Sequence, residues 1–176
     1  MRVMKFAPRI LWLGIASACG LAAQTTGTST LSLNIPAEAS ITITTSTTNL
    51  TSASAFAPYT GTTGFSFSIR TSASGGTGSI QLKITSDFTP SGGPSVGTPP
   101  TAGDLLTYAC TASTGTACSG SQTASTAAST PVVVFGADAH SPGAGASGTV
   151  SWSLTNDPTY KSGSYNATAT FTISAT

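Results

Sequence analysis

The sequence predicts an all-β fold built from antiparallel sheets. Apolar and polar residues alternate with a period of two in several separate runs, and no run has the period of a helix. Such alternation places one face of a strand on a core and the other in water, as is typical of antiparallel sheets. Clusters of Gly, Pro and Ser separate the runs, which lie at residues 31–35, 41–43, 65–69, 80–84, 150–154 and 165–173.

The connections between these runs refine the prediction. Residues 132–135 are continuously apolar, which predicts a strand buried on both sides. The Gly75-Gly76 pair predicts a hairpin turn, and the Pro- and Gly-rich stretch 90–103 predicts a loop. About seven to nine short strands in a single domain favour an immunoglobulin-like β-sandwich, and a small closed barrel is the alternative.

The N-terminus has the pattern of a secretory signal peptide. Basic residues precede a short apolar run at 10–16, and small residues lead to Ala23. This order is typical of a cleaved leader, and the apolar run is too short to span a bilayer as a helix. We therefore expect a signal peptide at 1–23 and one β-sandwich domain at 24–176. The alternative is processing before Cys19, which would leave a lipid anchor on that residue.

Cleavage would leave a nearly uncharged protein. The leader holds three of the six basic residues, so three basic and five acidic residues remain, a charge of −2. No basic patch is left to neutralise phosphates, so we expect no nucleic-acid partner. No second apolar run is long enough to predict a transmembrane segment. The chain is expected to be exported, to the periplasm, the cell surface or the exterior.

Two cysteines remain after the leader, and an even pair in an exported protein predicts a disulfide. Cys110 and Cys118 would face each other across a hairpin whose loop is Ser113-Thr114-Gly115. Gly115 then occupies the third loop position, where a left-handed residue is needed.

Residues able to carry catalysis are scarce. Asp138 and His140 have the spacing that puts two side chains on one face of a strand, but a metal site would need a third ligand from Asp87, Asp104 or Asp157. The single histidine, His140, would be the base of a small hydrolase. We expect a protein that is not an enzyme, without a metal or cofactor.

The aromatic residues leave a second function open. Trp152 is in phase with Val150 and Leu154, which predicts a core position. Tyr160 and Tyr165 are expected to fix the corner before the last strand. If these rings were exposed together instead, they would form a stacking platform, and the protein would be a carbohydrate-binding module.

The C-terminal segment 160–173 resembles the last strand of secreted bacterial immunoglobulin-like domains and of the spore coat U and chaperone–usher pilin group. Gly163 is the fourteenth residue from the end when the last residue is counted as one, as in those pilins, whereas Ala175 replaces their penultimate Tyr. The resemblance implies that Leu31, Leu33 and Ile35 form a strand that completes the sheet of a neighbouring subunit. Pairing of this segment within its own domain is the alternative.

Together these features predict a secreted or cell-surface structural or interaction protein, in its specific form a subunit of an extracellular fibre. Its partners would be further copies of the chain or other surface proteins.

Overall fold

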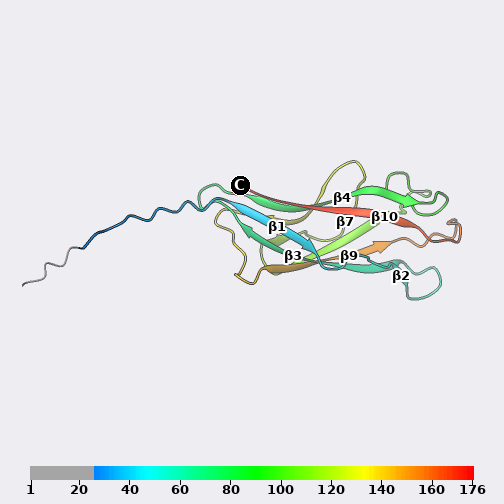
Figure 1. Ribbon diagram of the computed structural model, residues 1–176. Coiled ribbons are helices and arrows are strands. Elements are labelled where there is room, and N and C mark those ends of the chain that lie inside the picture. Colours follow the sequence, from blue (N-terminus) through cyan, green and yellow to red (C-terminus); the bar gives the residue numbers. More distant parts are fainter. Residues whose placement is uncertain (1–25) are drawn as a thin grey trace, which may run out of the picture. The chain divides into compact units, whose positions relative to one another are not determined.

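The computed structural model describes residues 26–176; the predicted leader at 1–23 and Cys19 lie outside them. The described chain contains ten antiparallel strands in two sheets and no helix, which confirms the all-β prediction (Figure 1). The described residues therefore contain no helix that could cross a membrane. The strands are β1 (Glu38–Ile43), β2 (Thr51–Ser52), β3 (Tyr59–Arg70), β4 (Gly78–Thr89), β5 (Leu106–Ala112), β6 (Thr116–Ala117), β7 (Gln122–Thr123), β8 (Thr130–Phe135), β9 (Ala146–Leu154) and β10 (Asn166–Ala175).

The strand order can be compared with that of the predicted immunoglobulin-like sandwich. The first sheet runs β1-β3-β9-β5-β7, with β2 beside β3, and the second runs β10-β4-β8-β6. Strands β1, β3, β9 and β5 follow the A-B-E-D order of such folds, and β4 beside β10 corresponds to C beside F. No strand in the described chain occupies the position of G next to β10. Two separate sheets also rule out the closed barrel.

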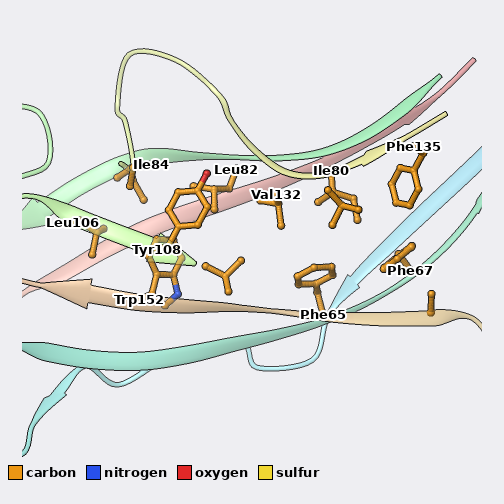
Figure 2. Close-up of a cluster of buried hydrophobic side chains, with 14 of the residues drawn as sticks. Phe65, Phe67, Ile80, Leu82, Ile84, Leu106, Tyr108, Val132, Phe135 and Trp152 are labelled. Atoms are coloured by element: carbon orange, nitrogen blue, oxygen red, sulfur yellow. The ribbon is translucent and has the colours of Figure 1, made fainter. Parts of the chain in front are cut away.

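Side chains from both sheets fill one core (Figure 2). Phe67 of β3 packs on Phe135 of β8 with ring centroids 5.5 Å apart, so the contact joins the two sheets. Tyr108 of β5 crosses the core in the same way, because its hydroxyl donates to the Pro131 carbonyl of β8 at 2.9 Å. This packing is consistent with the predicted β-sandwich. The largest fully buried side chains are Tyr108, Phe65, Phe135, Ile80, Leu82, Val132, Val133 and Val150.

Three local predictions are wrong. Gly75 and Gly76 do not turn a hairpin, because β3 and β4 belong to different sheets and this segment carries the chain between them. Strand β8 is not buried on both sides, since Val134 is 53% exposed. Residues 31–35 do not pair as a strand within their own domain, so that alternative is wrong, whereas their pairing with a neighbouring subunit stays a prediction. The alternating pattern alone does not tell which strands become neighbours.

Candidate functional site

Strand β10 forms one edge of the second sheet. It pairs with β4 along its length, from Asn166↔Thr89 to Ala175↔Gly78, and within residues 26–176 it has no strand on its other side. The inward side chains that pack against the core are only half-buried; they are Ala169, Phe171, Ile173 and Ala175. The outer backbone groups of β10 are thus free to pair with another strand.

Strand β1 forms the neighbouring edge of the first sheet. Within the described residues it pairs with β3 alone, from Glu38↔Arg70 to Ile43↔Phe65. Ala39, Ile41 and Ile43 point inward and are half-buried, in contrast to Phe65, which is 1% exposed. The two edge strands approach each other without pairing, and the Phe171 ring of β10 lies 5.9 Å from the Phe65 ring beneath β1.

We call this boundary the β1/β10 seam. Along it, both flanking strands expose part of their apolar face. The resemblance pointed to the last strand, but the sequence could not identify β1 as its neighbour.

The segment before β1 carries an unused apolar row. Leu31 is 95% exposed, Leu33 is 82% exposed and Ile35 is 58% exposed. The intervening Ser32 and Asn34 keep the period of two that a strand requires. Pro36 then separates this segment from β1, and its carbonyl accepts a hydrogen bond of 2.9 Å from the Arg70 guanidinium.

The predicted disulfide between Cys110 and Cys118 is present, with the two Cα atoms 5.4 Å apart. Its predicted setting in a two-stranded hairpin is wrong. Cys110 lies on β5 in the first sheet, whereas Cys118 follows β6, which pairs with β8 in the second sheet. The bond therefore joins the two sheets. Gly115 does have the predicted left-handed conformation, with φ of 83°.

Asp138 and His140 do not form a paired ligand set. The His140 ring donates through Nδ1 to the backbone carbonyl of Asp138 at 2.9 Å, so this ring nitrogen is already used within the loop. His140 lines a shallow hollow of about 380 Å³ with Glu38 and Arg70, whose side chains form an ion pair at 3.2 Å. In the part of the chain that the structure describes, no three His, Cys, Asp or Glu side chains converge.

The aromatic side chains are divided between the core and the end of the fold. Trp152 is 6% exposed and packs on Tyr108, which is 1% exposed, with centroids 5.6 Å apart. Neither ring offers a face for sugar stacking. The half-buried Tyr165 donates from its hydroxyl to the Lys161 carbonyl at 2.7 Å. This bond makes the predicted corner before β10, as in immunoglobulin-like sandwiches.

Comparison with known proteins identifies no relative. No protein-family model, no curated protein and no solved structure matches this chain.

Proposed function

We propose that this protein is an exported structural subunit that assembles with copies of itself by strand addition. Residues 31–35 of one copy would pair with the free edge of β10 in the next, and Leu31, Leu33 and Ile35 would cover the β1/β10 seam. The observation that carries the proposal is the coexistence of one exposed apolar row with one incompletely covered core in the same chain.

The spacing of the two surfaces supports this pairing. Alternate residues of a strand lie about 6.6 Å apart. The apolar side chains at 31, 33 and 35 therefore have the same repeat as those at 169, 171 and 173 on β10. Small polar residues at 32 and 34 would face outward, like the Thr-rich outer face of β10.

The free energy of burying apolar side chains also favours residues 31–35 as the strand that covers the β1/β10 seam. Burying one Leu or Ile side chain stabilises a complex by about 1.5–3 kcal/mol, and main-chain bonds to the edge add to this. The disulfide between the sheets is typical of proteins that fold in an oxidising compartment, which supports export. A carbohydrate-binding function receives less support, because Trp152 and Tyr108 are buried.

The test is the size of the purified mature chain, residues 24–176, measured by light scattering after gel filtration. We expect polymers that dissociate in denaturant. Leu33→Asp places a charge in the seam and should leave monomers, whereas the matched control Ser32→Asp changes the outward face and should still polymerise.

Two results would overturn the proposal. One is a mature chain that stays monomeric at all concentrations, with the amides of residues 31–35 protected from hydrogen exchange, since the segment would then pair within its own domain. The other is equal polymerisation of Leu33→Asp and wild type.

A further inference from the structure

A second feature lies at one end of the first sheet, where three strands are aligned. Tyr59 at the start of β3 pairs with Leu154 at the end of β9, and Leu154 also pairs with Leu106 at the start of β5. The loops beyond these positions therefore meet at the same end. They bring together Asp104, two residues before Leu106, and Asp157, three residues after Leu154.

Asp104 is a buried carboxyl group with an unused oxygen. The residue is 4% exposed, and its Oδ2 atom has no hydrogen-bond partner in the described structure. The hydroxyl of Tyr160 is also buried, and it lies within hydrogen-bonding range of the Asp104 carboxyl group. One neutral hydroxyl compensates a buried carboxylate only in part, and the remaining cost of burial favours a further ligand at this carboxyl group.

The surrounding groups concentrate negative charge at this point. Burial raises the pKa of the Tyr160 hydroxyl, and the nearby Asp104 carboxylate raises it further, so this hydroxyl stays neutral. The backbone N–H of Thr159 donates to Asp157 Oδ1 at 2.7 Å and is the main cause that lowers the pKa of Asp157. Asp104 and Thr101 also lie within hydrogen-bonding range of the Asp157 carboxylate.

Within residues 26–176, no basic side chain forms an ion pair with Asp104 or Asp157. Across residues 26–176, the one ion pair joins Arg70 to Glu38. Arg70 is the last residue of β3, whereas Tyr59 is its first, so that pair lies at the opposite end of the strand. Two adjacent carboxylates without a counter-charge repel each other unless a proton or a cation lies between them.

We propose that Asp104 and Asp157 bind a hard divalent cation of the calcium class, with the Tyr160 hydroxyl oxygen as an additional ligand. Ca²⁺ accepts carboxylate, hydroxyl and backbone oxygens in irregular geometry and completes its shell with water, so two carboxylates on loops suit it. The ligands are all oxygen, which disfavours zinc and copper. Bound Ca²⁺ would tie the loop before β5 to the loop after β9.

The sequence did not predict this site. It offered Asp104 and Asp157 as candidates for a third ligand beside Asp138 and His140, and not as a pair. The proposal is independent of strand exchange, because neither carboxylate belongs to β1, β10 or residues 31–35.

The probe is Tb³⁺, a luminescent substitute for Ca²⁺ that tyrosines sensitise at short range; Tyr160 lies at the site and Tyr59 starts the adjacent strand. The mature chain is stripped with EDTA and titrated with Tb³⁺, and Ca²⁺ is then added in competition. We expect tyrosine-sensitised emission that Ca²⁺ displaces, and an unfolding temperature that rises with Ca²⁺. Asp104→Asn and Asp157→Asn should each weaken Ca²⁺ binding by about tenfold or more, because each removes a ligand charge.

Glu38→Gln is the matched control, since it removes a carboxylate at the far end of β3 and should leave binding unchanged. If Asp104→Asn fails to fold, Asp157→Asn, at a half-buried loop position, decides the test. The proposal is overturned if wild type gives no Ca²⁺-displaceable emission and no thermal shift, or if both Asn variants respond as wild type does. It is also overturned if Asp104→Asn stabilises the protein while wild type ignores Ca²⁺, because the two carboxyl groups would then share a proton.

Discussion

At the residue scale, two hydrogen bonds satisfy polar groups at the edge of the core. The indole N–H of Trp152 donates to Thr63 Oγ1 at 2.8 Å, and Thr63 is itself 6% exposed. Thr63 also shares a hydrogen bond of 2.6 Å with the hydroxyl of Thr48. The polar end of the largest core side chain is therefore satisfied by one hydroxyl on the neighbouring strand.

Replacing Thr63 with Val should destabilise the protein by about 1–3 kcal/mol, because it leaves the buried indole N–H without an acceptor. The measurement is the free energy of unfolding in urea. Thr62→Val, at the adjacent exposed position of β3, makes the same chemical change and should stay within about 0.5 kcal/mol of wild type. Equal effects of the two substitutions would show that the Trp152 contact contributes nothing.

Asp87 anchors the long loop after β4. Burial of its carboxylate raises the pKa, but this is outweighed by four hydrogen bonds that lower the pKa below its usual value. The donors are the backbone N–H groups of Val96 (2.8 Å), Gly97 (3.0 Å) and Phe88 (2.8 Å) and the hydroxyl of Ser95 (2.7 Å). One ionised side chain thus orders the start of the predicted loop.

The stability that Asp87 provides should depend on pH. A carboxyl group with a lowered pKa in the folded state stabilises above its unfolded pKa of about 4, and this contribution is lost as the pH falls through the folded pKa. We expect Asp87→Asn to be less stable than wild type at pH 7 and the gap to close below about pH 4. The exposed Asp138→Asn serves as the control. A gap that is constant from neutral to acid pH would contradict this role.

At the element scale, the disulfide acts between sheets rather than within a hairpin. Cys110 and Cys118 close a loop whose ends lie on β5 and just after β6, which belong to different sheets. Reduction, or the double substitution of both cysteines by Ala, should lower stability by about 2.5 kcal/mol on the chain-entropy model. Urea unfolding with and without reductant measures this. Since the double variant lacks the bond, reductant should not change its stability, and any such change would assign the wild-type effect to another cause.

The strands at the centre of the fold were easier to predict from the sequence than the strands beside them. Residues 65–69, 80–84 and 150–154 have clear alternation because one face of each lies on the core, and all three are strands. The first part of strand β5, before Cys110, was missed because small residues such as Ala109 blur its pattern. Pairing was predicted least well, since β3 and β4 are consecutive yet enter different sheets.

The candidate sites also divide into those that the sequence could predict and those that depend on how the strands pair. The exposed row at 31–35 and the two cysteines could be named from residue type and spacing. The β1/β10 seam and the Asp104–Asp157 pair could not, because each joins segments that are far apart in the sequence and adjacent only after the sheets form.

At the scale of the whole molecule, the open β1/β10 seam limits the stability of an isolated copy. The inward side chains of both edge strands are half-buried, so part of the apolar face stays in contact with water. A strand placed there would bury these side chains together with its own, and each fully buried apolar side chain contributes about 1.5–3 kcal/mol. Stability and assembly should thus depend on the same surface.

A self-complemented chain tests this link directly. Residues 28–36 would be moved from the N-terminus to follow Thr176 through a short Gly/Ser linker, so that they can return along β10 as the missing strand. The C-terminus is suitably placed, because the Thr176 carbonyl accepts from Ser72 N–H at 3.0 Å beside the end of β10. We expect a monomer that is more stable to urea than the chain without residues 28–36, by at least about 2 kcal/mol after the cost of closing the linker.

The matched control carries the same fusion with Leu31, Leu33 and Ile35 replaced by Ser. It keeps the length, the linker and the main-chain donors but loses the apolar row, so it should gain little stability. Light scattering and urea unfolding of the three chains separate the two contributions. If the Ser fusion is as stable as the Leu and Ile fusion, main-chain pairing alone fills the edge. If neither fusion gains stability, the seam does not accept this segment, and assembly must use another surface.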